Sequence, residues 1–282
     1  MSEHSSGSLL PAGSCDCHSH LYLPLDEYPV RPGQHFEANA GTEEYLDVCN
    51  QLGVSRHVIV EGKAFAGPCS TLAALSRLGP ERSRAVIFPT DKMTDEQLVA
   101  WHDAGVRGFR FLFRAGEDID SDRIAAAAKR VTHLGWHVIV QAEAEELISH
   151  YGRFASLPTP VVIDHIGRLP KGASAPNPAL TALLDFLAGG GWIKLSSPYN
   201  VTADGASDFS SLADVVRSLV STAPDRCIWG LNFPHPNLPA GKKPDEIATA
   251  RSLLKLLDKT ESHRLFVTNP QRLYDFPAAS EG

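Results

Sequence analysis

Three histidines of this chain lie directly at or after short apolar segments. His18 and His20 close a segment that begins at residue 14, and His165 follows the apolar run 161–163. Side chains two positions apart on an extended chain point to the same side, so the first two imidazoles can face one pocket. Polar residues that close an apolar strand lie where barrel enzymes carry catalytic groups. We therefore predict that His18, His20 and His165 are catalytic. The alternatives are two solvent-exposed loop histidines and one buried histidine bonded to backbone.

Cationic side chains accompany other apolar segments. Arg110 lies in the segment 108–111, and Arg114 lies four residues further on. A guanidinium group grips a carboxylate through two parallel hydrogen bonds, so we predict that both arginines bind an anionic or strongly polarised carbonyl substrate. The alternative for Arg114 is a solvated loop charge. Lys63 follows the apolar segment 57–60, and Lys194 lies at the end of the segment 192–195. Either lysine could neutralise an oxyanion or sit in a structural ion pair, and we count Lys63 among the substrate-binding candidates.

Short apolar segments alternate with longer amphipathic ones along the chain. Eight segments are predicted to be strands: 14–18, 57–60, 85–88, 108–111, 137–140, 161–163, 192–195 and 227–229. Eight are predicted to be helices: 42–52, 70–78, 94–104, 121–134, 143–154, 177–187, 209–222 and 244–257. This alternation predicts a single (β/α)8 TIM-type barrel, in which all strand ends meet at one mouth. An open doubly wound sheet is the rival, but the chain has no G-x-G-x-x-G turn. Long loops, 21–41 and 168–178, follow the first and sixth strands, as loops that cover an active site do.

Composition narrows the class of protein. The chain has 282 residues, a net charge of -7 and no basic stripe, so nucleic-acid and membrane partners are not expected. No segment approaches the roughly 18 apolar residues that span a bilayer. Residues 1–12 lack the features of a signal peptide; we predict a disordered lead over 1–12, one domain over 13–282 and a cytoplasmic location. The five cysteines are predicted to be buried free thiols: Cys15, Cys17, Cys49, Cys69 and Cys227.

Six motifs occur in an order that resembles the amidohydrolase superfamily. They are D-C-H-S-H at 16–20, G-V-R-G-F-R at 105–110, V-I-D-H-I-G at 162–167, K-L-S at 194–196, W-G-L-N-F-P-H-P at 229–236 and N-P-Q-R-L-Y at 269–274. The resemblance covers roughly residues 13–276 and is strongest to the branch that contains 2-pyrone-4,6-dicarboxylate lactonase, 4-sulfomuconolactone hydrolase and D-galactarolactone isomerase. It implies a distorted barrel in which the histidines matching His18, His20 and His165 polarise a lactone carbonyl. Independently of the resemblance, we predict that Asp16 buttresses the first strand and its histidines through hydrogen bonds.

Several positions depart from the pattern of that branch. Asn232 stands where the family has the aspartate that activates water, and an amide cannot take a proton near neutral pH. Tyr199 is followed by asparagine where the family often has arginine, and Gln141 replaces a substrate-contacting tyrosine. His235 is common in the family; it is a structural residue or, with Asp164, a candidate replacement base. We predict Asn232 as catalytic and Gln141, Tyr199 and His235 as substrate-binding.

Three functions remain open from the sequence. The first is a metal-independent hydrolase of a lactone or related cyclic ester that bears a carboxylate or polarised carbonyl. The second is a non-hydrolytic reaction in the same pocket: lactone isomerisation, decarboxylation or rearrangement of an enolisable substrate. The third is a non-catalytic ligand-binding barrel. No cofactor is expected; three imidazoles can hold zinc, but a carboxamide is a poor replacement for the missing carboxylate ligand. The partner is a small-molecule substrate, and the oligomeric state is not predicted.

Overall fold

The computed structural model of the chain describes residues 8–34, 37 and 40–277. Eight parallel strands pair in sequence order around a barrel. The strands are β1 (Cys15–Ser19), β2 (Arg56–Val60), β3 (Ser83–Ile87), β4 (Val106–Leu112), β5 (His137–Gln141), β6 (Val161–Ile163), β7 (Trp192–Leu195) and β8 (Cys227–Trp229). The predicted (β/α)8 barrel is therefore confirmed.

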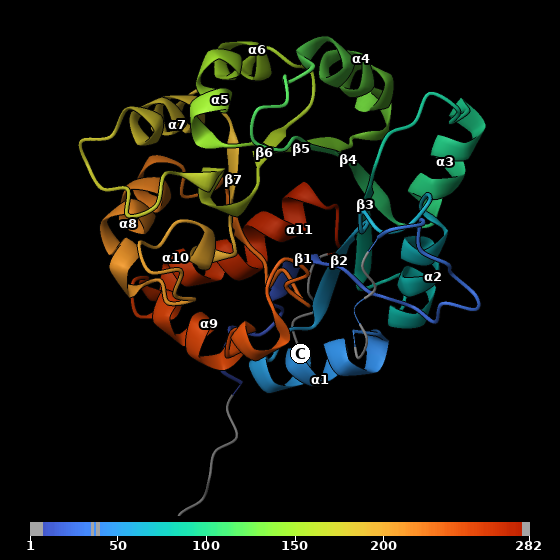
Figure 1. Cartoon of the computed structure of the whole chain (residues 1–282), viewed down its shortest axis with the longest axis horizontal. Coiled ribbons are helices and arrows are strands. Elements are labelled where there is room, and N and C mark those ends of the chain that lie inside the picture. The colour runs from blue at the N-terminus through green and yellow to red at the C-terminus, as the bar shows by residue number, and fades with distance from the viewer. Residues whose placement is uncertain (1–7, 35–36, 38–39, 278–282) are drawn as a thin grey trace, which may run out of the picture.

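Helices surround the strands (Figure 1). They are α1 (Thr42–Leu52), α2 (Cys69–Leu78), α3 (Asp95–Asp103), α4 (Ser121–Val131), α5 (Ala144–Leu147), α6 (Tyr151–Ala155), α7 (Pro178–Ala188), α8 (Ala213–Thr222), α9 (Glu246–Leu254), α10 (Lys259–His263) and α11 (Asn269–Leu273). The helix predicted over 143–154 is divided, because the 3-10 turn η2 (Ile148–His150) separates α5 from α6. The helices after residue 257 were not predicted.

The barrel closes between β1 and the segment that follows β8. The backbone N–H of Asn232 donates to the carbonyl of His18 (2.6 Å), and that of His20 donates to the carbonyl of Phe233 (2.7 Å). Gly230 lies at this seam, where a Cβ atom would stand 2.8 Å from the backbone nitrogen of His18. The seam therefore holds the two histidines of β1 beside Asn232.

The C-terminal segment fills the end of the barrel at which the strands begin, and α11 lies across the centre in Figure 1. Tyr274 and Phe276 pack with apolar residues of the strands in an inner core cluster. Two arginines from the starts of β2 and β3 stack on the Phe276 ring, with Arg56 5.3 Å and Arg84 4.5 Å from its centroid. The amino-terminal ends of the strands are thus covered, and the carboxyl ends carry the cavity.

Two predictions need correction here. Residues 1–7 of the predicted disordered lead lie outside the described residues, but Leu10 is 2% exposed and its N–H donates to the carbonyl of Leu52. The ordered domain therefore begins before residue 13. Cys69 is exposed, at the start of α2, whereas the other four cysteines are buried; all five are free thiols. Among the described residues, no helix has the length and apolar character to cross a membrane.

Candidate active site

A cavity of about 480 Å³ opens at the carboxyl ends of the strands. Its walls include seven of the residues predicted from the sequence: His20, Lys63, Arg110, Arg114, Gln141, His165 and Asn232. Three predicted residues do not line it: His18, Tyr199 and His235. Each of the three lies directly behind a lining residue.

His18 and His20 form one hydrogen-bonded line beneath the cavity. The Nδ1 of His20 lies 2.8 Å from the carbonyl oxygen of Val60, so this nitrogen must carry the proton. The Nε2 of His20 is then an acceptor, and it lies 3.2 Å from the Nε2 of His18. The Nδ1 of His18 lies 3.1 Å from the ammonium of Lys194 and 3.3 Å from the Oδ1 of Asp164. A proton on Nε2 lets Nδ1 accept from Lys194, whereas a proton on Nδ1 lets it donate to Asp164. The carbonyl of Val60 therefore fixes the tautomer of His20.

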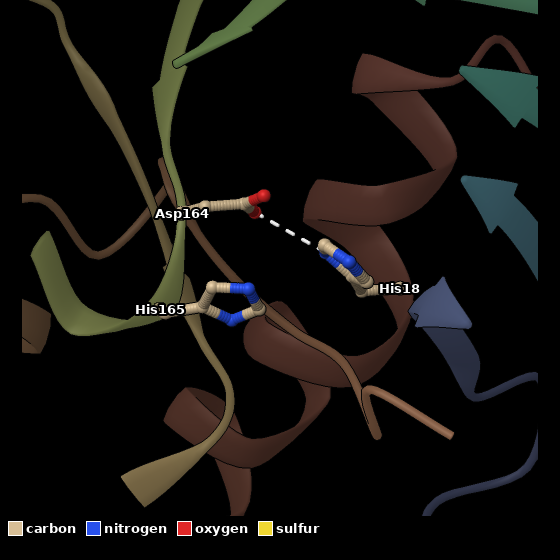
Figure 2. Close-up of side chains that lie close together, drawn as sticks. All are labelled: His18, Asp164 and His165. Carbon is tan, nitrogen blue, oxygen red and sulfur yellow. Dashed lines mark hydrogen bonds and ion pairs between the residues drawn. The ribbon is translucent and has the colours of Figure 1, made fainter. Parts of the chain in front are cut away.

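An ion-paired cluster joins β1, β6 and β7 at the floor of the site. The rings of His18 and His165 are 4.8 Å apart between centroids, and Figure 2 shows both beside Asp164. The carboxylate of Asp164 lies 2.9 Å from the Nζ of Lys194, and both side chains are fully buried. The imidazoles from the first and sixth strands thus meet, as the sequence analysis expected. His18 is 0% exposed, so it supports the floor instead of forming its surface.

The three imidazoles are neutral at neutral pH. Burial lowers the pKa of His18 well below its ordinary value, and it lowers the pKa of His20 and of His165 to about 3. The positive charge of Arg110 lowers the pKa of His20 and His165 further, since a second cation nearby is unfavourable. The Nδ1 of His165 bonds with Ser196 Oγ at 2.8 Å, which leaves its Nε2 for the cavity.

Arg110 supplies a buried positive charge to the cavity wall. Its side chain is 4% exposed, its Nη2 donates to Oε1 of Gln141 at 2.8 Å, and another contact of 3.9 Å reaches Asp164. Its Nε has no hydrogen-bond partner among the described residues. This nitrogen is buried, whereas the Arg110 side chain as a whole forms part of the cavity wall. Arg114 and Lys63 are exposed at the rim of the same cavity.

Asn232 occupies a strained position on the cavity wall. Its φ of 67° places it in the left-handed region, as do the φ values of His165 and Ser197 at the ends of β6 and β7. Such conformations in non-glycine residues gather at functional sites. The Nδ2 of Asn232 donates to the hydroxyl of Tyr199 at 2.7 Å. Tyr199 and His235 thus lie behind Asn232 instead of on the cavity wall.

The sequence analysis missed Glu246, which completes this group. Its Oε1 lies 2.5 Å from the Nε2 of His235, and burial raises the pKa of this carboxyl. Glu246 is the first residue of α9, and no spacing rule relates it to a strand end.

Asp16 holds the first and eighth strand ends together. Its carboxylate accepts from the backbone N–H groups of His18 (3.0 Å) and Leu231 (2.9 Å) and from the hydroxyl groups of Tyr45 and Ser19. The predicted role of Asp16 as a buttress of the first strand is therefore confirmed.

The buried cluster does not suit a divalent metal ion. His18, Asp164 and His165 offer ligand atoms that lie within 4.8 Å of one another. The ammonium of Lys194 already lies within 3.1 Å of two of these residues, and Arg110 stands on the cavity side of the carboxylate. A divalent ion at this place would meet two buried cations and one carboxylate, and the two cations oppose its binding. The imidazole of His18 and the carboxylate of Asp164 suit the ammonium group of Lys194 better than a metal ion.

Polar and cationic side chains that converge at the carboxyl ends of barrel strands define the active site of a (β/α)8 enzyme. The chain belongs to the amidohydrolase family: the family model described as Amidohydrolase matches residues 15–276. It is similar to 2-pyrone-4,6-dicarboxylate hydrolase of Comamonas testosteroni, with 32% identity over 94% of this chain and 91% of the relative. It is also similar to D-galactarolactone isomerase of Agrobacterium fabrum, with 29% identity over 94% of this chain and 91% of the relative.

A solved structure of a protein from Agrobacterium tumefaciens, free of ligand, has the same fold. It superposes with a TM-score of 0.82 at 29% identity and covers 95% of this chain and 97% of that chain. These comparisons confirm the resemblance found in the sequence. They also confirm that the chain is a hydrolase-class enzyme of the amidohydrolase superfamily.

Proposed function

We propose that this protein is a metal-independent hydrolase that opens a lactone or related cyclic ester bearing a carboxylate or polarised carbonyl. The observation that carries this proposal is the convergence of His20, Arg110, His165 and Asn232 on one cavity. Relatives that share its length are named as a pyrone-dicarboxylate hydrolase and a lactone isomerase. The substrate is accordingly a small molecule.

In this mechanism the cavity activates the carbonyl group of the substrate. The guanidinium group of Arg110 and the imidazole of His165 hold the carbonyl oxygen and stabilise the charge that develops on it. Because both imidazoles on the wall stay neutral, they do not add charge that would repel Arg110. Arg114 and Lys63 at the rim attract a carboxylate on the substrate.

Among the described residues, the carboxylate that lines the cavity is that of Glu143, and it is paired with the Nε of Arg168 at 2.7 Å. Burial would raise the pKa of Asp164, but Lys194 and His18 hold that pKa well below its ordinary value, so this carboxylate is a poor proton acceptor. His235 is bonded at both ring nitrogens and does not line the cavity. Neither group is a good replacement for the aspartate that the family has at position 232. Catalysis then rests on polarising the carbonyl, with Asn232 orienting the nucleophile through a hydrogen bond.

The pairing of Glu143 with Arg168 and of Asp164 with Lys194 also favours the second candidate, lactone isomerisation. A hydroxyl group of the substrate is held next to the carbonyl at a very high effective concentration, so it needs less activation than water. Turnover in water enriched in oxygen-18 separates the two reactions. Hydrolysis incorporates solvent oxygen into the product, whereas attack by a substrate hydroxyl incorporates none.

The direct test is a panel of lactones that includes 2-pyrone-4,6-dicarboxylate, lactones with one carboxylate and uncharged lactones. We expect turnover of a carboxylated lactone and loss of at least about 10²-fold in kcat/KM for Arg110→Met, since one oxyanion donor is worth that much. An exposed arginine outside the site, Arg217→Met in α8, is the matched control. Failure of every lactone to react would contradict the proposal.

Metal independence has its own test. We expect full activity after dialysis against a chelator and no stoichiometric metal in the purified enzyme by elemental analysis. Activity that falls on chelation and returns with zinc would overturn this part of the proposal. A cytoplasmic location stays a prediction from the sequence.

A further inference from the structure

Four side chains form a continuous line of hydrogen bonds behind the cavity wall. The Nδ2 of Asn232 donates to the Tyr199 hydroxyl at 2.7 Å, and that hydroxyl lies 3.1 Å from the Nδ1 of His235. The Nε2 of His235 in turn lies 2.5 Å from the Oε1 of Glu246. Asn232, Tyr199 and His235 are 5%, 7% and 4% exposed. We call these four residues the orienting chain.

The chemistry of each group fixes the direction of these bonds. The Nδ2 of Asn232 can only donate, so the Tyr199 oxygen accepts from it and the hydroxyl proton points to His235. His235 then presents a lone pair at Nδ1 and carries its proton on Nε2, toward Glu246. That lone pair accepts the hydroxyl proton of Tyr199.

We propose that Glu246, His235 and Tyr199 are positioning residues that hold the Asn232 carboxamide with its carbonyl oxygen toward the cavity. Because the Nδ2 is engaged with Tyr199, the Oδ1 is the polar atom of the side chain that remains for the ligand. Under the lactone chemistry proposed above, on which this role rests, the oxygen accepts a hydrogen bond from the attacking water or substrate hydroxyl. It aims the nucleophile but does not take its proton.

The orienting chain is matched to an amide and not to a carboxylate. Tyr199 gives its only proton to His235, so an aspartate at position 232 would face the lone pairs of the tyrosine oxygen. Two acceptors at 2.7 Å repel each other. The replacement of the family aspartate and the bonding of His235 to Glu246 therefore form one consistent arrangement.

The first test needs no substrate. In protein labelled with nitrogen-15 histidine and asparagine, NMR reads the protonated nitrogen of His235 and the solvent exchange of the Asn232 side-chain NH2. His235→Gln and Asn232→Asp identify the two signals by their loss. We expect the proton on Nε2 of His235, and about tenfold faster exchange of the Asn232 NH2 in Tyr199→Phe and Glu246→Gln, as expected for a lost hydrogen bond. A proton on Nδ1, or an unchanged Asn232 signal in both variants, overturns the proposal.

The second test measures kinetics with the lactone that the panel above identifies. Tyr199→Phe and Glu246→Gln each remove few atoms, and we expect kcat to fall about tenfold while KM changes less than about twofold. Tyr151→Phe, another buried tyrosine, and Glu96→Gln, an exposed first-turn glutamate of α3, are matched controls that keep wild-type kcat. An equal loss in the controls would reduce the role to general stability and overturn it. If the NMR results hold but no lactone reacts, the orientation of Asn232 stands and the proposed function fails.

Discussion

Asn232 is the residue that separates this site from a conventional water-activating one. Its amide lies at the seam of the barrel beside His20, at the place where the sequence motif of the family carries a carboxylate. Asp164 and His235, the candidate replacements, are both committed to other partners. The described part of the cavity therefore offers a positive, carbonyl-binding wall on which the carboxylate of Glu143 is paired with Arg168.

Asn232→Asp should raise the rate of lactone hydrolysis. General-base assistance is worth about 10² to 10⁴-fold. We expect a gain at the lower end, about 10²-fold, because the Tyr199 hydroxyl must first turn its proton from His235 toward the new carboxylate. The measurement is kcat with solvent oxygen-18 incorporation. Asn200→Asp, which adds a carboxylate elsewhere on the cavity wall, should give no gain. A fall in hydrolysis in Asn232→Asp would argue that water attack is not the reaction of this site.

Asp164→Asn should destabilise the protein strongly. It leaves the fully buried ammonium of Lys194 without its carboxylate, which costs about 3–5 kcal/mol of unfolding free energy. Urea denaturation measures the loss, and the double variant with Lys194→Met should recover part of it. Asp122→Asn is the control, because its pair with Arg153 is exposed and worth less than about 1 kcal/mol. Equal losses for the two single variants would contradict the buried role.

At the scale of elements, the closure between β1 and β8 places the catalytic side chains. Backbone bonds across the seam bring His18 and His20 beside Asn232, and Asp16 holds the backbone of both sides through its carboxylate. The site thus depends on how closely the two strand ends approach.

Gly230→Ala tests this dependence. The added methyl group would lie 2.7 Å from the Cβ of His18 and 2.8 Å from its backbone nitrogen, so the seam must open. We expect a loss of about 1–3 kcal/mol in unfolding free energy, as for an overpacked core, and a fall in activity. Gly152→Ala in α6 meets no atom within 4 Å and should leave stability equal or slightly higher. A seam that tolerates the methyl group without either loss would contradict the argument.

The strand ends of this site were predictable, whereas their partners were not. His20, Arg110 and His165 stand out because each closes or follows a short apolar strand, and strand periodicity is local in the sequence. Glu246 contacts His235 from the first turn of a helix, and no local pattern marks such a contact. The C-terminal helices were missed because they are short, and a proline stands in the last of them.

At the scale of the whole molecule, buried neutral histidines make the fold sensitive to acid. Burial lowers the pKa to about 3 for His20, His137 and His165, and to about 4 for His57, from an ordinary 6.5. Between these values the unfolded chain binds more protons than the folded chain, so stability falls as pH decreases. Burial raises the pKa of Glu61 to about 7 and also raises the pKa of Asp16 and of Glu246, which has the opposite effect. His18 is a fifth histidine with a lowered pKa, so these histidines outnumber the three carboxyl groups.

We therefore expect the free energy of unfolding to decrease from about pH 6.5 to about pH 4, by up to about 1.4 kcal/mol per pH unit for each histidine. Urea denaturation at several pH values measures this slope. His137→Asn should flatten the slope by about one histidine's share, whereas the exposed His133→Asn should not. Stability that rises as the pH is lowered through this range would contradict the neutral state of the buried imidazoles.

The C-terminal segment closes the amino-terminal end of the barrel, so substrate and product pass through the same opening at the carboxyl ends of the strands. Ring opening of a lactone creates one more carboxylate, so the departing molecule is more anionic than the one that entered, and it must leave past Arg114 and Lys63. We therefore expect product release to limit kcat and the opened acid to inhibit the enzyme competitively. Salt screens exposed charges over about 10 Å at 0.1 M. Added salt should therefore speed product release and weaken inhibition by the product.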